Sequence, residues 1–203
     1  GLSDRAEQHS FLEKVLHKKI FVIGMPELSD SYLFHLDMFM TPIETSDGKL
    51  KVLFGSLKYT MNEIMKISSE KNLPTWANSF YWSKKLKAEE KLKAQLKELG
   101  IETVDVPIFF VEPEAFALKT GIPAIVSFNN GIFSDKTFFA AKYLSKFPDL
   151  NQFLTAAERI IESKFHDELD SKIEWIPGGE SIIGFGGGVR CMAGVIRQAD
   201  KQK

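Results

Sequence analysis

The sequence contains a single cysteine, Cys191, among its 203 residues. One cysteine cannot form an intramolecular disulfide, and it cannot build a cysteine-rich zinc or iron–sulfur site. No apolar run approaches the roughly 18 residues that a membrane-spanning helix needs. The chain begins Gly1-Leu2-Ser3-Asp4-Arg5, without an initiator methionine, a basic segment or an apolar segment. This start does not predict a signal peptide.

An excess of charge of either sign is also absent. The chain has 26 Lys and Arg against 27 Asp and Glu, a net charge of −1, which argues against a broad surface for nucleic acid or anionic membrane. Hydrophobic residues make up 44% and charged residues 26%, as in ordinary globular proteins. The length suits one domain that buries roughly 70% of its unfolded surface.

Hydrophobic periodicity and turn signals predict an α/β fold of repeated ββαβ units, arranged as stacked or radial modules. The first unit contains a strand at 34–43, a turn at Asp47-Gly48, a strand at 50–54, helices at 60–69 and 83–99, and a strand at 103–110. The second contains strands at 124–128 and 132–141 joined by Asn129-Asn130-Gly131, a helix at 150–165 and a strand at 173–176. A helix at 7–19 and a strand at 20–24 end a preceding copy, and a strand-like stretch at 181–197 begins a following one.

The helix at 83–99 is expected to start with Ser83 as N-cap and to end before Gly100 at C′. Glutamates lie among its lysines, which favours a solvated face with i,i+4 ion pairs over a nucleic-acid surface. These lysines are Lys84, Lys85, Lys87, Lys91, Lys93 and Lys97. The aromatic residues just before them, Trp76 and 80–82, are expected to pack in the core.

Two stretches carry residues suited to catalysis. His35 and Asp37 lie two apart at the start of a predicted strand, so both point to one face. The alternative is a histidine at the core edge with a surface aspartate. The second stretch is Gly184-Phe185-Gly186-Gly187-Gly188-Val189-Arg190-Cys191-Met192, which matches neither a P-loop nor a dinucleotide fingerprint.

In this second stretch Arg190 precedes the only cysteine, and a cation beside a thiol favours the nucleophilic thiolate. The alternative is a small buried hydrophobe. Both stretches open the first strand of a copy. If the copies are arranged radially, their first strands converge and bring Cys191, His35 and Asp37 together, as covalent nucleophilic catalysis requires.

These residues resemble the guanidine-modifying enzymes of the pentein superfamily. His-Leu-Asp at 35–37 resembles the catalytic histidine motif, and Gly-Gly-Gly-Val-Arg-Cys-Met at 186–192 resembles the terminal nucleophile motif, closest to arginine deiminases. Ser3-Asp4-Arg5 resembles the Ser-x-Arg segment of the family, although Ala6 replaces its threonine. The resemblance implies a five-unit α/β propeller with a central active site. Residues 1–203 would form a single partial domain of about three units.

By this resemblance Cys191 would be the nucleophile, His35 the general acid and base, and Asp37 the ligand of the guanidinium. Substrate-binding residues would be Arg5, Arg190, Gly187 and Gly188. The implied protein is a cytoplasmic amidinohydrolase for arginine or a related small guanidino compound, without metal, organic cofactor, nucleic acid or membrane. A homo-oligomer is left open.

The chain departs from the family in lacking two carboxylate-bearing segments that normally lie upstream, which leads us to expect part of a longer enzyme. Two alternatives therefore remain. One is an amidinotransferase with the same cysteine–histidine chemistry, although Arg190-Cys191-Met192 favours the hydrolases. The other is a catalytically incomplete propeller that serves as a binding module.

Overall fold

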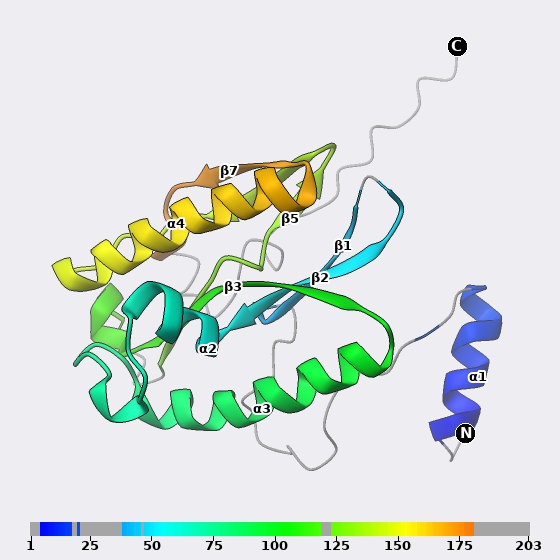
Figure 1. Cartoon of the computed structure of the whole chain (residues 1–203), viewed down its shortest axis with the longest axis horizontal. Helices are drawn as coiled ribbons and strands as arrows, with labels where there is room; N and C mark the ends of the chain where they lie inside the picture. Colours follow the sequence, from blue (N-terminus) through cyan, green and yellow to red (C-terminus); the bar gives the residue numbers. More distant parts are fainter. Residues whose placement is uncertain (1–4, 18–19, 21–37, 46, 119–122, 181–203) are drawn as a thin grey trace.

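Two ββαβ units form most of the fold (Figure 1). The computed structural model describes residues 5–17, 20, 38–45, 47–118 and 123–180. In the first unit an antiparallel pair of strands is followed by a helix and by a strand parallel to the second of the pair. Its members are β1 (Met40–Glu44), β2 (Leu50–Ser56), α3 (Ser79–Glu98) and β3 (Glu102–Val111). The second unit repeats this order with β5 (Ile132–Ser134), β6 (Thr137–Ala141), α4 (Pro148–Leu169) and β7 (Lys172–Ile176).

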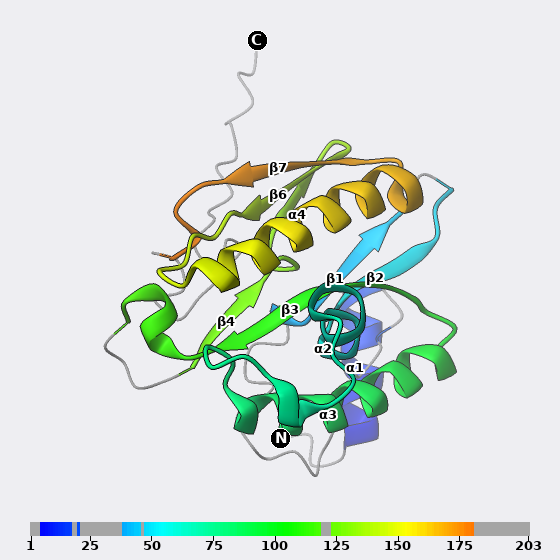
Figure 2. The same ribbon diagram turned by 60° about the vertical axis from the view of Figure 1, so that its left-hand side comes forward.

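The order ββαβ occurs twice, as predicted, but the second unit starts with β5 and not with the strand predicted at 124–128, which is β4 (Ala124–Ser127) and pairs with β3. A parallel pair needs a crossover connection, which α3 and α4 supply (Figure 2). The turn between β1 and β2 falls at Asp47-Gly48 as expected, with Gly48 at φ +76°, a conformation that glycine adopts without strain. The predicted strands at 20–24 and 181–197 and the start of the one at 34–43 lie outside the described residues, apart from Ile20.

Strand β3 pairs with two different strands along its length. Its first part, Glu102 to Pro107, pairs with β2 in parallel, and its second part, from Ile108 to Val111, pairs with β4 (Ala124–Ser127) in antiparallel. Proline has no N–H to donate, so Pro107 suits the point where one pairing ends. The next N–H along the chain, that of Ile108, donates a hydrogen bond to the Thr60 hydroxyl oxygen at 3.0 Å. The four strands therefore form one sheet in the order β1-β2-β3-β4.

The hairpin predicted at Asn129-Asn130-Gly131 is wrong. β4 pairs with β3, and the second hairpin joins β5 to β6, with Asp135 at φ +43° between them. Asn129 is instead fully buried, with its side chain bonded to the backbone of the first unit. The segment 128–131 thus leads the chain from the four-stranded sheet into the three-stranded sheet β5-β6-β7 (Figure 2).

Gly131 provides the first testable prediction. A Cβ at this position would lie 2.4 Å from both the Phe138 ring and the Phe139 carbonyl oxygen, so Gly131→Ala forces backbone to move. We expect the free energy of unfolding to fall by about 3 kcal/mol, measured by urea denaturation. Gly100→Ala is the control, since a Cβ there meets no atom within 4 Å and only the positive φ is unfavourable. Equal losses in the two variants would contradict the steric explanation.

All four predicted helices differ in extent from the prediction. The helix predicted at 7–19 spans Arg5–Leu16, and His17 after it has φ +50°. α3 starts at Ser79 because Asn78 caps it, accepting from the Tyr81 N–H at 3.1 Å, whereas Ser83 lies inside the helix. The helix expected at 60–69 consists of α2 (Leu57–Tyr59) and a π-helical turn, η3 (Thr60–Met65), and it ends at Lys66 in the left-handed conformation. α4 extends from Pro148 to Leu169. The remaining helices are α1 (Arg5–Leu16), η4 (Glu70–Asn72) and η5 (Pro113–Phe116).

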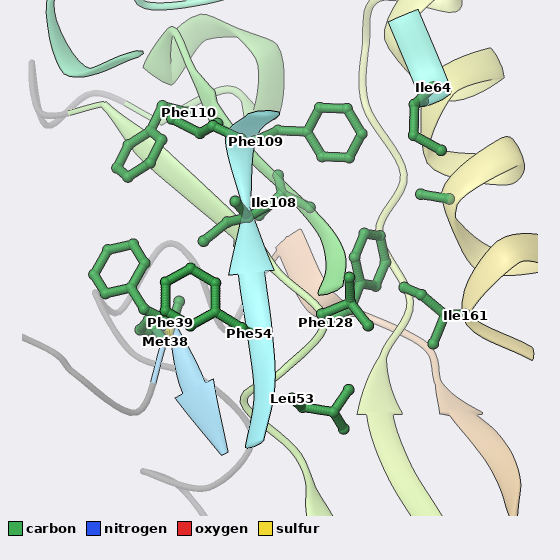
Figure 3. Packing of buried hydrophobic residues seen from close by; sticks show 14 of the residues in the cluster. Met38, Phe39, Leu53, Phe54, Ile64, Ile108, Phe109, Phe110, Phe128 and Ile161 are labelled. Atoms are coloured by element: carbon green, nitrogen blue, oxygen red, sulfur yellow. The ribbon is translucent and has the colours of Figure 1, made fainter. Parts of the chain in front are cut away.

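Both faces of the central strands are buried. Side chains alternate along a strand, so Phe54 points to the side of Phe39, and its neighbour Leu53 points to the opposite side, where Phe128 and Ile161 of α4 also lie (Figure 3). Trp82 of α3 is fully buried on the first side and donates its indole N–H to the Phe110 carbonyl at 2.8 Å. The core therefore consists of two apolar layers on either side of one sheet.

The aromatic residues expected in the core follow the prediction in part. Trp76 and Trp82 are buried and Tyr81 is half-buried, but Phe80 is 55% exposed. The apolar side chains of α1 are also largely exposed, between 44% and 54%: Phe11, Leu12, Val15 and Leu16. We find no helix in the described ranges whose length and hydrophobicity would let it span a bilayer.

Candidate active site

In the sequence, the residues proposed for catalysis come before and after the strands and helices that form the core. His35 and Asp37 lie outside the described residues, just before Met38 and Phe39, which lead into β1. Cys191, with Arg190, Gly187 and Gly188, lies within 181–203, also outside the described residues. Arg5 is the first residue of α1, and its side chain is not described.

The entry to β1 is in contact with β4 and with the segment that follows β4. The Ser127 hydroxyl at the end of β4 donates to the Met38 carbonyl oxygen at 2.5 Å. In the reverse direction the Thr41 hydroxyl on β1 donates to the Asn129 carbonyl oxygen at 2.6 Å. All four residues are buried. The beginning of β1 is therefore tied to the end of β4 and to the segment that follows it.

Asn129 makes the most extensive connection at this contact. Its side-chain Nδ2 donates to the Phe39 carbonyl at 2.8 Å and to the Leu53 carbonyl at 3.1 Å. The Phe39 carbonyl also accepts from the Gly55 N–H at 2.8 Å. The Asn129 side chain thus bridges β2 and the residue just before β1. Sequence reasoning missed this role because Asn-Asn-Gly is also a common turn sequence.

Tyr143 supports the same contact from the far side. Its hydroxyl donates to the Ser127 carbonyl at 2.9 Å, and its side chain is buried. Burial raises the pKa of the Tyr143 phenol well above its usual value, against a smaller lowering effect of the bond to Ser127. The phenol therefore remains a hydrogen-bond donor across the pH range in which the protein would work.

A buried lysine lies beside the entry to β1. Lys85 on α3 is 1% exposed, its Nζ lies 3.6 Å from the centroid of the Phe39 ring, and no group in the described ranges forms a hydrogen bond with it. Burial lowers the pKa of Lys85 to about 7; nearby Glu89 opposes this shift and Lys93 adds to it. The prediction that all six lysines of this helix are solvated is wrong for Lys85.

The buried carboxylate of Glu89 forms a network four residues further along α3. Its Oε2 accepts from the Leu57 N–H at 2.8 Å, and its Oε1 accepts from the Ser56 hydroxyl, so it caps the start of α2. Lys93 lies 3.3 Å from Glu89 and 2.6 Å from Asp105. These groups pair with one another, although the Asp105 Oδ1 is buried without a hydrogen-bond partner in the described residues, whereas the Lys85 ammonium forms no hydrogen bond with any described group.

The described side chains around Phe39 form hydrogen bonds with backbone groups. A nucleophile would therefore have to come from the adjoining segments of the chain. Within the described residues we find no group of three or more His, Cys, Asp or Glu side chains suited to a metal ion. What the described geometry supplies is therefore a set of hydrogen bonds to Met38 and Phe39, the residues that follow Asp37 in the chain.

Comparison with known proteins gives a match in structure. The solved structure of an agmatine deiminase from C. jejuni superposes on 93% of this chain with a TM-score of 0.56 and 14% sequence identity. The two proteins share a fold. This finding supports the expected pentein-type α/β architecture, and at 14% identity it concerns the fold alone. The chain spans 45% of the length of that structure. No family model and no curated protein sequence matches the present chain.

Proposed function

We propose that this chain is the part of a guanidino-group hydrolase that carries its nucleophile and its acid–base residue. The observation that carries the proposal is the shared fold with an agmatine deiminase over 93% of the chain. The motifs at 35–37 and 186–192 add the residue types that such chemistry needs. The substrate would be arginine, agmatine or another small guanidino compound.

In the proposed reaction the Cys191 thiolate attacks the guanidinium carbon and forms a C–S bond. His35 donates a proton to the departing nitrogen, the C–N bond breaks, and ammonia or an amine leaves. His35 then takes a proton from water, whose oxygen attacks the same carbon. The C–S bond breaks and the thiolate is restored, the remaining proton of the added hydroxyl passes to solvent, and a neutral ureido product is released.

The remaining residues would hold the substrate. Asp37 would accept hydrogen bonds from the guanidinium nitrogens, because a carboxylate matches their planar pair of donors. Arg5 and Arg190 would attract a substrate carboxylate, and the backbone at Gly187 and Gly188 would approach the substrate closely, since glycine has no Cβ. The cation of the substrate would itself favour the thiolate of Cys191. None of these steps calls for a metal or an organic cofactor.

The experiment compares the full natural protein with its Cys191→Ala variant on arginine and agmatine, measuring ammonia and the ureido product. We expect turnover in the natural protein and a loss of at least about 1,000-fold in the variant, because the covalent route is removed. Thermal unfolding of both proteins controls for folding. Product that forms only after an amine acceptor is added would indicate an amidinotransferase, and turnover that survives in Cys191→Ala would exclude the proposed mechanism.

A further inference from the structure

Lys85 is buried where α3 meets the entry to β1. Its Nζ lies 3.6 Å from the centroid of the Phe39 ring and 5.5 Å from that of the Phe54 ring, and it forms no hydrogen bond with any described group. Both rings are themselves buried. An aromatic face attracts a cation but is only a weak hydrogen-bond acceptor. A protonated Lys85 therefore has three N–H groups and no described oxygen to receive them.

The charged groups around Lys85 are engaged elsewhere. On α3 these are Glu89, one turn further along, and Lys93, another turn beyond it. At the end of β2 the Ser56 hydroxyl donates to Glu89, and from β3 Asp105 pairs with Lys93 at 2.6 Å. The approach to β1 contributes the Phe39 ring. Protonation of Lys85 thus places a charge where no described carboxylate bonds it.

This arrangement couples opening of the site to uptake of a proton. Burial lowers the pKa of Lys85 to about 7, while Glu89 raises it and Lys93 lowers it further, whereas a hydrated lysine titrates near 10.5. Between these two values the closed site holds a neutral amine and an open, hydrated site holds an ammonium. The ratio of open to closed molecules should therefore rise about 10-fold for each unit by which the pH falls, and level off below about pH 7.

The entry to β1 is the weaker side of the contact. Within the described sheet β1 is the edge strand, paired with β2 alone, and Pro42 in it has no N–H to donate. In contrast, α3 is anchored on either side of Lys85 by Trp82 and Leu92, both fully buried. Edge elements open at a lower free energy than elements anchored in the core. Movement of Phe39 should therefore expose the Lys85 amine before α3 leaves the sheet.

We propose that Lys85 is a proton-operated switch for the approach to β1: when the buried amine takes a proton from solvent, the contact between Phe39 and α3 opens and water reaches the ammonium, and loss of the proton closes it. The edge of the four-stranded sheet would then respond to pH near neutrality. The switch involves described residues only, and it holds whether or not the protein hydrolyses a guanidino compound.

Hydrogen exchange of the full natural protein, followed by NMR between pH 6 and pH 9, tests the switch. The Gly55 N–H donates to the Phe39 carbonyl at 2.8 Å, so it reports the opening of this contact. After correction for the intrinsic exchange rate, we expect its opening constant to fall about 50-fold from pH 7 to pH 9 and to change less than about 3-fold between pH 6 and pH 7. It should exceed the constant for global unfolding, measured in urea at the same pH, at least about 10-fold.

Three variants examine the amine itself. In Lys85→Met the opening constant of Gly55 should not depend on pH, and it should lie at or below the value of the natural protein at pH 9. In Lys85→Arg the side chain stays charged across this range, so the constant should remain at or above the natural value at pH 6. Lys87→Met, on the exposed side of the same helix, is the matched control and should behave like the natural protein.

The indole N–H of Trp82 distinguishes which side moves. It donates to the Phe110 carbonyl at 2.8 Å and should exchange only through global unfolding. Exchange of Trp82 together with Gly55 would mean that α3 leaves the sheet, and it would overturn the proposed movement. Exchange of Gly55 at the rate set by global unfolding at every pH, or a pH dependence that persists in Lys85→Met, would overturn the switch. These results decide the proposal even if Lys85→Arg does not fold.

Discussion

Replacing Lys85 by methionine is expected to stabilise the protein by about 1–4 kcal/mol at pH 6, measured as the free energy of unfolding in urea. At that pH the lysine is protonated in the folded and unfolded states, so folding buries an ammonium that has no hydrogen-bond partner within the described residues. Methionine has a similar length and packs against the Phe39 ring without that charge. The contact of the ammonium with the ring offsets only part of the penalty.

The gain should disappear as the pH rises. Lys85 has a folded pKa of about 7, lowered by burial, against 10.5 for the free group. Between these values the unfolded state binds more protons, so the natural protein gains about 1.4 kcal/mol of stability per pH unit. Lys85→Met lacks this dependence. The stability difference between the two proteins should therefore decrease by about 4 kcal/mol between pH 7 and pH 10.

The difference is the useful quantity because other titrating groups are common to both proteins and cancel. Lys87→Met, on the exposed side of the same helix, is the control and should change stability by less than about 0.5 kcal/mol at either pH. If the advantage of Lys85→Met were the same at pH 6 and pH 10, the buried ammonium would not be the cause.

The largest loss of stability is expected for Glu89→Ala, about 3–5 kcal/mol at pH 7. The substitution leaves the buried Leu57 N–H and the Ser56 hydroxyl without their acceptor, and it takes from Lys93 one of its two carboxylates. It also removes the negative charge that partly stabilises the Lys85 ammonium. Urea unfolding at pH 7 measures the effect. Glu89→Gln should lose less, because its amide oxygen can still accept from Leu57.

Two comparisons make this prediction specific. Glu90→Ala removes the neighbouring carboxylate, which is exposed and pairs with Lys58 only at 3.9 Å, and it should change stability by less than about 1 kcal/mol. In a double-mutant cycle, Lys85→Met should stabilise the Glu89→Ala protein more than it stabilises the natural one, since the ammonium there has no compensating charge. Simple additivity at pH 7 would contradict the coupling of these two side chains.

The parts of the fold that could be predicted from the sequence are those governed by local chemistry. Asp47-Gly48 favours a tight turn. The β-prone apolar runs on either side of it are the two paired strands of one hairpin, β1 and β2. The same holds for the order of strands and helices. The second hairpin could not be predicted this way, because Asn129-Asn130-Gly131 satisfies the local rules for a turn while its use is decided by distant carbonyls on Phe39 and Leu53.

The candidate site shows the same division. His35, Asp37 and Cys191 were chosen by residue type and by a motif resemblance, and their roles remain predictions. The groups that support them are polar residues whose importance lies in contacts about 90 positions apart, such as Asn129 with Phe39. Lys85 is different: it lies three residues after Trp82 and seven before Leu92, on the buried face of α3, so helical spacing could have indicated its burial.

Strand β3 has a consequence for how such proteins can be divided. Six of its residues pair with β2, and the last four pair with β4, which precedes the second unit in the chain. A recombination or cleavage between β3 and β4 would leave one end of β3 with an unpaired edge, which invites association with other chains. The repeat is therefore one of connectivity, and its units are not independent folding modules. Engineering that exchanges a unit would have to transfer β3 and β4 together.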